Sequence, residues 1–516
     1  MARTAHEKTI AAIKRARTKR LATLATKSYY LHKRKQDEKL YTLICEEFIG
    51  LGGVYIKFLQ GVLLRSKIMR KWQGKDKLKI FENLDSEPID ITALLQAELP
   101  KNRLSQIALI QPQPFAAGSF GQVYYGQLQN GQAIVVKVLR PMVRELLKYD
   151  IKLLTRFSKT FFSKLNKNAG IKLTAAMKDF TEATLRETDY RNEAQFAHEL
   201  YEYYKDHSSL VIPKTYLELC TDNIIVQDYI DGISVAQIIR LQEQGAKPVD
   251  YVRETLGSDL ATQLQVLGYE SIVGIFDLPR IQGDPHPGNV RLMRDNKVGL
   301  IDFGISASAP KSKNNLYALM SAIDQIFKGS DAKNLLVQGM KFFVGDLYKA
   351  LMRLGEFIGQ KNDHNYIDDV AQVAGKFLIG EDGTSNFEKD LKNDAGVLGS
   401  MTKIVNKGNR FGLAMNLEAT EVLRAIQTYT SMLGSLGMYR KVMAPMMDQA
   451  VAQIGRIHPE LLVESKETVS VGQAIETVSR WLERVAERDP LLFRQLSEKM
   501  NIGETPLLKP EGEKPA

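Results

Sequence analysis

The stretch IQGDPHPGNVRLMRDNKVGLIDFG, residues 281–304, constrains the fold of this 516-residue chain more than any other. Its two β-rich runs, VRLM and KVGLID, flank the turn sequence RDN and predict a β-hairpin. Asp284 and Asn289 precede this hairpin, and Asp302 follows it. Because the two strands of a hairpin run antiparallel, we expect its ends to bring Asn289 and Asp302 onto one metal ion. Alternatively, Asp284 and Asn289 cap turns among the neighbouring prolines and glycines.

A second informative stretch, FAAGSFGQVYYG, covers residues 115–126. The runs QVYYGQLQ and QAIVVKVL follow, joined by Asn130 and Gly131, and predict a hairpin with a type I′ turn, which requires positive φ at both turn residues. A phosphate-binding loop needs small residues, so that backbone N–H groups reach the ligand, and a strand lysine nearby, here Lys137. By itself, the loop is equally consistent with a small-residue turn that serves packing alone.

The order of these elements is that of a protein kinase: loop, strand lysine, Asp284 five residues before Asn289, and then Asp302-Phe303-Gly304. A kinase also needs a glutamate that pairs with the lysine. We expect Glu193 to fill this role, although it lies 56 residues after Lys137, which is farther than usual. A helical insertion inside the small lobe is therefore implied.

Coarse periodicity completes the predicted fold. Helical patterns cover 40–109 and 142–204, a second strand pair covers 216–220 and 224–229, and helices follow Gly304. The fold class is α+β: a bilobal protein-kinase-like fold with a small β-sheet N-lobe, a helical C-lobe, and helical regions at both ends. The expected segments are a basic helical arm at 1–45, a helical extension at 46–110, the N-lobe with its insertion at 111–232, the catalytic core of the C-lobe at 233–310, a C-terminal helical region at 311–502 and a disordered tail at 503–516.

Charge is concentrated at the N-terminus, because residues 1–39 carry +9 of the chain's net +10. A solvated helix explains this arm most simply, followed by adhesion to an anionic membrane surface and then by organelle targeting. Nucleic acid is disfavoured, since Tyr29 and Tyr30 lie together at one end rather than between the basic residues. The two cysteines predict neither a disulfide framework nor a zinc cluster, and no apolar window is long enough for a transmembrane helix. We expect a cytoplasmic or organelle-matrix protein that is soluble or peripherally membrane-associated.

Several motifs together resemble the UbiB/AarF atypical kinases, a family associated with ubiquinone and other isoprenoid lipids. They are ETDYRNEA at 187–194, GDPHPGN at 283–289 and IDFG at 301–304. The family's Lys-x-Gly-Gln motif corresponds to Lys57 and Gln60 in GGVYIKFLQG. The resemblance covers roughly residues 46–304 and continues more faintly into a helix near 418–436.

The resemblance implies a role for each matching residue. Lys137 would hold the nucleotide phosphates and pair with Glu193, and Asp284 would be the catalytic aspartate. Asn289 and Asp302 would bind Mg²⁺. Lys57 and Gln60 would reach into the site against Glu187 and Asp189, as regulatory residues. The expected nucleotide-binding residues are Ala116, Ala117, Gly118, Ser119, Phe120, Gly121, Val123, Lys137, Asp228 and Tyr229.

The chain also departs from the family pattern. Leu59 replaces the family's glycine in Lys-x-Gly-Gln, and Gly118 and Gly121 make the alanine-rich loop more like an ordinary kinase loop. The family's altered nucleotide preference and restrained self-phosphorylation therefore do not carry over directly. Gln282 stands at the usual catalytic-loop histidine, and His286 at the usual lysine.

The resemblance predicts an atypical kinase or ATPase that uses Mg²⁺ with ATP or ADP and supports isoprenoid-lipid metabolism at a membrane surface. The chain after IDFGISASAP lacks Ala-Pro-Glu and a long polar loop, which disfavours peptide substrates. Two alternatives remain: a small-molecule phosphotransferase of the aminoglycoside-kinase type, and a nucleotide-binding pseudokinase that serves as a scaffold.

Overall fold

The computed structural model describes residues 5–59, 89–118, 120–165, 177, 180–182, 184–329, 338 and 417–462. The chain forms two compact units. The first contains Met1–Asp206, Val211–Asp231 and Ile301–Ile305; the second contains His207–Leu210, Gly232–Leu300 and Ser306–Ala516. The segment Ile301–Ile305, which we expected in the C-lobe, thus belongs to the first unit.

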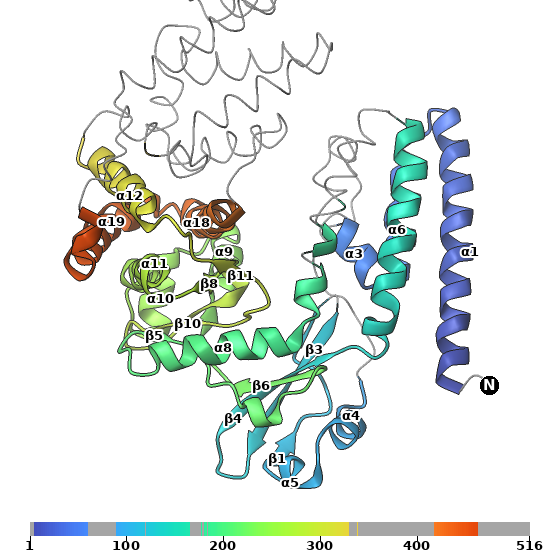
Figure 1. Ribbon diagram of the computed structural model, residues 1–516, viewed down its shortest axis with the longest axis horizontal. Coiled ribbons are helices and arrows are strands. Elements are labelled where there is room, and N and C mark those ends of the chain that lie inside the picture. The colour runs from blue at the N-terminus through green and yellow to red at the C-terminus, as the bar shows by residue number, and fades with distance from the viewer. Residues whose placement is uncertain are drawn as a thin grey trace, which may run out of the picture. The chain divides into compact units, whose positions relative to one another are not determined.

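The first unit is built on an antiparallel sheet with strand order β1-β3-β4-β6, in which β2 also pairs with β3 (Figure 1). Its strands are β1 (Ile107–Ile110), β2 (Ala116–Ala117), β3 (Gly121–Leu128), β4 (Ala133–Leu139) and β6 (Ile224–Asp228). Side chains along β3 and β4 alternate between buried and half-buried, as expected for a sheet covered on one face. The buried face packs against Ile91 and Leu95 of α4 (Ile91–Glu98).

Two sequence predictions in this region were wrong. Strand β1 begins inside 40–109, the range that we expected to be helical. A four-residue apolar run shows too little periodicity to distinguish a strand from a helix. Residues 216–220 contain the 3₁₀ helix η2 (Leu217–Leu219) instead of a strand. A local hydrogen bond forms this helical turn: the N–H of Leu219 donates to the carbonyl of Tyr216 at 2.8 Å.

The turn predicted between β3 and β4 also differs. Gly131 has φ +87°, but the φ of Asn130 is not positive. The N–H of Gly131 donates to the carbonyl of Leu128, which indicates a three-residue loop with a left-handed glycine. The Asn130 side chain accepts from the N–H of Gln132 at 3.0 Å and so helps to hold this geometry. Two adjacent residues with positive φ, Asp295 and Asn296, lie instead between strands β9 (Val290–Leu292) and β10 (Val298–Leu300).

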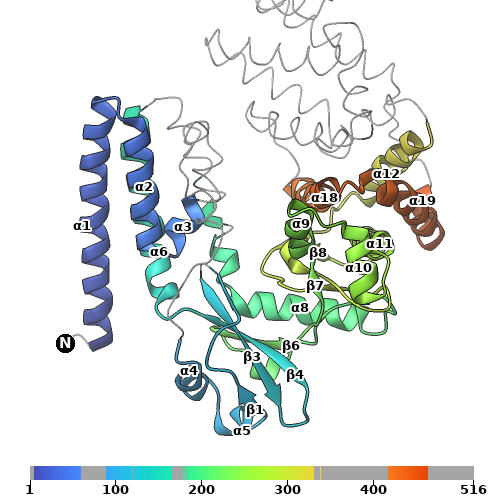
Figure 2. The same cartoon turned by 180° about the vertical axis from the view of Figure 1, so that it is seen from behind.

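The basic arm is part of the first unit. Helices α1 (Ala5–Lys33), α2 (Asp37–Leu51) and α6 (Val143–Leu165) lie side by side (Figures 1 and 2). Leu21 and Leu24 of α1 are buried in the core of the unit, and Arg17 forms an ion pair with the buried carboxylate of Asp150 on α6. The arm is thus a helix whose exposed face is solvated, as expected, but whose few apolar residues share one face and dock it on the unit. The expected boundary at residue 45 falls inside α2.

Further helices of the first unit whose bounds the structure describes are α3 (Val54–Phe58), α5 (Lys101–Leu104) and α8 (Tyr190–Tyr204). The α6–α8 stretch is the helical insertion that the spacing between Lys137 and Glu193 implied. Aromatic side chains hold the N-terminal helices together: Phe48 contacts Tyr55, Phe58 and Phe157, with ring centroids 5.8, 6.2 and 5.8 Å apart. Each such contact adds to the burial energy of the rings.

The second unit contains a four-stranded sheet, ordered β5-β10-β9-β7, and a pair formed by β8 and β11. Its strands are β5 (Leu210–Val211), β7 (Ile233–Ser234), β8 (Arg280–Gln282), β9 (Val290–Leu292), β10 (Val298–Leu300) and β11 (Ser306–Ser308). The β9–β10 hairpin is the one predicted from residues 281–304. Strand β11, which pairs with β8, is an addition to the helices that we expected after Gly304.

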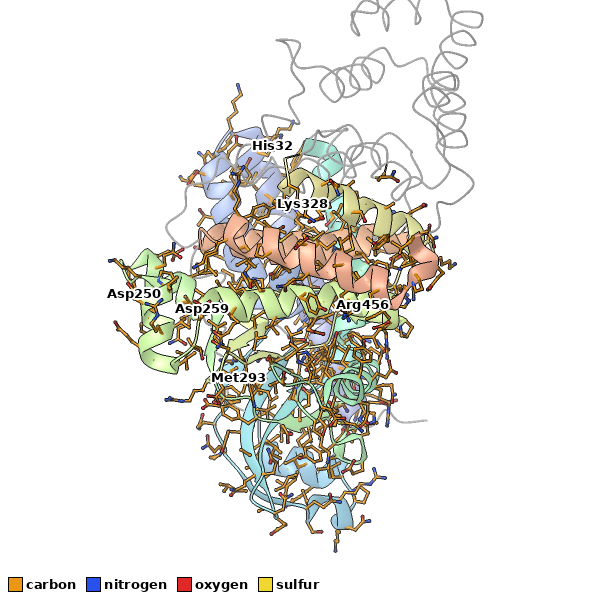
Figure 3. All side chains as sticks on the ribbon, turned by 90° about the vertical axis from the view of Figure 1, so that its left-hand side faces the viewer. His32, Asp250, Asp259, Met293, Lys328 and Arg456 are labelled. Carbon is orange, nitrogen blue, oxygen red and sulfur yellow. The ribbon has the colours of Figure 1, made fainter. Side chains whose placement is uncertain are left out.

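Within the described residues, the second unit contains helices α9 (Val235–Glu243), α10 (Pro248–Leu256), α11 (Leu260–Asp277), α12 (Lys313–Phe327), α18 (Leu417–Ser435) and α19 (Tyr439–Ile457), with 3₁₀ turns η3 (Pro287–Asn289) and η4 (Pro459–Leu462). In Figure 3, Asp259 marks the start of α11, Lys328 follows α12, and Arg456 lies in the last turn of α19. None of the helices in the described ranges is long and apolar enough to cross a membrane. The predicted tail at 503–516 lies outside the described residues.

Candidate nucleotide and metal site

The candidate site of the first unit centres on Lys137, on the half-buried face of the sheet. Its strand, β4, is hydrogen-bonded to a neighbour on each side, so the backbone that carries the lysine is fixed. Lys137 Nζ lies 2.6 Å from Glu193 Oε1, which the first turn of α8 provides. Asp189 caps this helix, because its carboxylate accepts from the N–H of Asn192 at 3.2 Å. The structure thus brings together the two residues that the sequence paired across 56 positions.

Asp302 joins this pair: its Oδ1 lies 3.4 Å from Lys137 Nζ. Asp302 has φ +67°, an uncommon conformation for a residue with a side chain. The N–H of Gly304 donates to the Asp302 carboxylate at 3.2 Å, and the N–H of Phe303 donates to Glu193 at 3.4 Å. The Phe303 ring also packs edge-on against Phe196 of α8, with centroids 6.2 Å apart. The Asp-Phe-Gly segment is therefore anchored to the helix that carries Glu193.

The charges of the three groups depend on one another. Burial raises the pKa of Glu193, whose side chain is only 2% exposed, and Lys137 opposes this shift. Burial lowers the pKa of Lys137, but Asp302 and Glu193 outweigh it and raise the pKa overall. Lys137 in turn lowers the pKa of Asp302. The lysine thus stays protonated and keeps Asp302 ionised.

This arrangement fits a magnesium–nucleotide complex. The Asp302 side chain is 50% exposed, so its carboxylate can accept a further ligand, and the cluster holds more carboxylates than ammonium groups. Mg²⁺ is commonly bound by one or two carboxylates together with substrate phosphates rather than by a cage of protein ligands. The described part of the chain contains no cluster of three or more His, Cys, Asp or Glu side chains that could hold a metal ion.

An aromatic group lies on the exposed side of the first unit. The Tyr229 ring contacts Tyr125 and Phe115 edge-on, with centroids 5.4 and 6.5 Å apart. Along β3 and β4, Val123, Tyr125 and Lys137 are all half-buried, so the strand alternation places them on one face. An apolar, aromatic surface of this kind suits a flat base. Phe115 and Tyr125 were missing from the expected site, although the alternation from Val123 could have identified Tyr125.

Tyr190 is a further residue that the sequence did not identify. Lys137 Nζ lies 5.3 Å from the centroid of its ring, and the ring is fully buried. Burial raises the pKa of the Tyr190 hydroxyl, so the side chain stays neutral. The neutral ring therefore makes a cation–π contact with the lysine ammonium and does not form an ion pair with it.

The loop residues differ in exposure. Ala116, Ala117 and Gly118 are exposed, whereas the Phe120 ring is buried in the core, and its predicted contact with nucleotide stays a prediction. The Gly118 N–H donates to the carbonyl of Gly121 at 2.9 Å, and the Arg140 guanidinium donates to the carbonyl of Gly118 at 2.9 Å. Ser119 lies outside the described residues.

Two more of the predicted nucleotide-binding residues lie at the end of β6: Asp228 is its last residue, and Tyr229 follows it. Asp228, whose pKa is raised by burial, accepts from the hydroxyl of Tyr216 at 2.8 Å. The N–H of Tyr229 donates to the carbonyl of Ala133 at 3.0 Å. These bonds hold the end of β6 beside β4.

Lys57, one of the predicted regulatory residues, lies near Phe120 of the loop. Lys57 on α3 forms an ion pair with Glu187, as expected, and its ammonium lies 5.6 Å from the centroid of the Phe120 ring. Asp189 instead has the local function of capping α8. Gln60 lies outside the described residues. Lys57 thus contacts the loop at 115–121 through the Phe120 ring.

In the second unit, Asp284 and Asn289 are joined through one turn. The Asn289 side-chain amide donates to the carbonyl of Asp284 at 3.3 Å, and the N–H of His286 donates to the same carbonyl at 2.7 Å. The His286 ring is exposed and accepts from the N–H of Gly288 at 3.2 Å. The Asn289 side chain thus holds this turn, whereas Asp284 takes part through its backbone carbonyl. The shared metal site of Asn289 with Asp302, which belongs to the first unit, stays a prediction.

A small antiparallel sheet, a strand lysine paired with a helical glutamate and an anchored Asp-Phe-Gly segment define a kinase-like protein. The family model described as the ABC1 atypical kinase-like domain matches residues 75–334, half of the chain. The chain therefore belongs to the ABC1 atypical kinase-like family, which confirms the UbiB/AarF resemblance and the predicted fold class. A kinase-type enzyme is the class of protein that this membership supports.

The chain is also similar to individual relatives. Activity of BC1 complex kinase 3, chloroplastic, of Arabidopsis thaliana is 26% identical over 269 residues, covering 51% of this chain and 36% of the relative. Activity of BC1 complex kinase 1, chloroplastic, of the same plant is 28% identical, covering 55% and 39%. A protein from the hydrogenase 1 5′ region of Clostridium pasteurianum is 31% identical, covering 51% and 48%. The chain thus spans less than half the length of these relatives.

A solved structure was also found. It is a Mycobacterium tuberculosis protein in complex with erythromycin, with 20% identity and a TM-score of 0.39, covering 66% of this chain and 83% of that one.

Proposed function

We propose that this ABC1-family protein binds ATP or ADP with Mg²⁺ and works as an atypical kinase or ATPase. In this proposal it supports isoprenoid-lipid metabolism of the ubiquinone type at a membrane surface. The observation that carries the proposal is the cluster of Lys137, Glu193 and Asp302 in the first unit, with 2.6 and 3.4 Å between the lysine ammonium and the two carboxylates. Phosphoryl transfer needs a fixed cation beside a metal-binding carboxylate.

Each residue would have a distinct part in this chemistry. Lys137 binds phosphate oxygens, and Glu193 holds the lysine side chain in position. Asp302 and Asn289 hold Mg²⁺, which when bound neutralises phosphate charge. Asp284 accepts the proton of the attacking hydroxyl or water.

The chain after the Asp-Phe-Gly segment supports a small acceptor. From Gly304 it passes through β11 directly into α12, which begins at Lys313. The N–H groups of Ser308 and Lys311 donate to Glu421 and Glu418 of α18, at 3.1 and 3.0 Å, so this connection is tied down. A peptide-docking loop has no place in such a connection, and we therefore favour a lipid-related small molecule over a protein substrate.

Nucleotide binding tests this proposal through Asp302. We expect Asp302→Asn to remove the Mg²⁺-dependent part of ATP or ADP affinity, because an amide loses the charge that the metal requires while keeping nearly the same shape. The measurement is nucleotide titration with Mg²⁺ and with EDTA. The control is Asp250→Asn, at an exposed surface carboxylate on α10. If Asp302→Asn keeps the full Mg²⁺ dependence, the metal assignment is wrong.

We also propose that α1 adheres to anionic membranes. Lys8, Arg15, Lys19 and Lys27 are exposed, and their spacing of seven, four and eight places them along one side of the helix. Anionic lipid attracts such residues by about 1 kcal/mol each. Deleting α1 would not test this idea cleanly, because the deletion also removes Leu21 and Leu24 from the core.

Charge removal gives a cleaner experiment. Changing these four residues to glutamine should weaken binding to phosphatidylserine vesicles at least about tenfold, with a smaller salt dependence. Co-sedimentation at two salt concentrations measures both effects. The matched control removes four exposed positive charges elsewhere: Lys101, Arg103, Arg294 and Lys297. Equal loss in both variants would show that net charge, rather than α1, governs binding.

A further inference from the structure

The second unit contains an apolar cavity of about 60 Å³. Its walls come from helices α11, α12, α18 and α19, together with β8 and the residues after it. Figure 3 shows α11 and α19 of this group, with Asp259 at the start of α11 and Arg456 in the last turn of α19. The packing around the cavity is tight, since a Cβ added at Gly268 of α11 would collide with Met446 and Tyr429. The cavity is thus a defined space in a close-packed region.

The cavity lining excludes charged ligands. None of the described residues that line it is charged, and most are aliphatic or methionine side chains. Its two hydroxyl groups are already used: Tyr429 donates to the carbonyl of Leu264 at 2.7 Å, and Ser271 donates to the carbonyl of Leu267 at 2.7 Å. A phosphate or sugar would lose its hydration here without adequate replacement. An apolar group is the ligand that this lining favours.

The size of the cavity indicates which part of a ligand it can take. One water-sized group needs roughly 10–15 Å³ of this kind of volume, so the cavity has room for about four to six non-hydrogen atoms. That is the size of one isoprene unit or the end of an alkyl chain. Four methionines, Met320, Met443, Met446 and Met447, line the space, and their flexible side chains can adapt to longer or branched chains.

The cavity also borders the predicted catalytic loop. Gln282 and Pro285 form part of its wall, on either side of Asp284. The N–H of Asp284 points to the side-chain oxygen of Gln282 at 3.4 Å. A ligand in the cavity therefore contacts the residues that hold Asp284.

We propose that this cavity binds the apolar end of a hydrocarbon-chain ligand and that the bound chain positions the loop around Asp284. Binding follows from the cavity alone, whereas the effect on turnover rests on the proposed kinase or ATPase function. The chain belongs to the acceptor molecule or to a separate lipid that activates the enzyme. Both sources share the same chemistry, and the experiments below distinguish them.

Binding is tested with two soluble probes: geraniol, which is a branched isoprenoid alcohol, and n-decanol, which is unbranched. The 516-residue chain carries 16 methionines, so ¹³C-methyl labelling reports on many parts of it at once. We expect either probe to shift the methyl signals of Met320, Met443, Met446 and Met447, with little change at the others. Equal shifts of all methionine methyl signals, or no shift of these four, would overturn the proposal. This test needs only the wild-type protein.

Two leucine substitutions in the wall provide a matched pair. Ala425→Leu adds three carbon atoms and fills the cavity, whereas Met443→Leu keeps about the same side-chain volume. We expect Ala425→Leu to weaken probe binding at least tenfold and Met443→Leu to keep it, measured by titration and by the probe-induced rise in melting temperature. Equal binding by Ala425→Leu and the wild type would place the probe elsewhere.

Turnover separates the two sources. If the chain belongs to an activator, geraniol or n-decanol raises ATP hydrolysis by the wild type but not by Ala425→Leu. If it belongs to the acceptor, phosphate appears on the probe hydroxyl. Probe binding with neither effect would overturn the positioning role. If the turnover of the wild type does not exceed that of Asp302→Asn, the proposed function is wrong. The proposal that the cavity binds a hydrocarbon chain is then still decided by the methionine methyl signals.

Discussion

Replacing Lys137 with methionine should reduce Mg²⁺-dependent ATP turnover at least about a hundredfold, because phosphate groups lose their fixed cation. It should also destabilise the first unit. Glu193, at 2% exposure, would lose its ammonium partner, and removing one member of a buried ion pair costs about 3–5 kcal/mol. Turnover assays and chemical denaturation measure the two effects separately.

A double variant separates catalysis from stability. In Lys137→Met with Glu193→Gln, the buried carboxylate becomes a neutral amide, so we expect most of the free energy of unfolding to return while turnover stays low. Lys148→Met, at an exposed lysine on α6, is the control and should change neither quantity. Wild-type turnover no higher than that of Lys137→Met would instead favour the pseudokinase scaffold.

The second large effect is expected at Gly121, at the start of β3. A Cβ at this position would lie 2.6 Å from the carbonyl oxygen of Val138 and 2.5 Å from the Tyr190 hydroxyl. Gly121→Ala therefore forces β3 away from β4 and displaces the ring beneath Lys137. We expect a loss of about 1–3 kcal/mol in the free energy of unfolding and a more than tenfold weaker nucleotide affinity.

Gly118 provides the contrast within the same loop. A Cβ there would meet only the carbonyl oxygen of Gly121, at 3.9 Å, and the backbone φ is not in the left-handed region. Gly118→Ala should therefore change stability by no more than about 0.5 kcal/mol. Any change in the ratio of ATP to ADP affinity would then report on the loop itself. Equal destabilisation by both alanine variants would contradict the packing found at Gly121.

The sequence treated these two glycines alike, as departures from an alanine-rich loop, and the structure separates them. Gly121 is dictated by the approach of β4 and Tyr190, which lie far along the chain, whereas Gly118 is exposed. The same limit explains the errors at β1 and η2. Short apolar runs fit several local structures, and pairing with distant strands decides between them.

The candidate-site residues that could be predicted lie at characteristic distances along the sequence from loops and hairpins. Lys137 follows a recognisable loop and hairpin, and Asp302 follows another hairpin, so both were identified from short-range signals. Glu193 came from a motif on a helix. Tyr190 and Phe115 escaped notice, because an aromatic residue in a sequence is more often part of a core than part of a ligand site.

By itself, the sequence determined the kinase-like class of fold, the order of its motifs and the partner of Lys137, because turn chemistry, strand alternation and motif spacing are local properties. Only the tertiary structure decided that α1 docks through Arg17 and Asp150, and that Ile301–Ile305 joins the first unit. It also decided that helices far apart in the chain enclose the apolar cavity. These features depend on burial and close packing between distant segments, and no local pattern encodes which segments will meet.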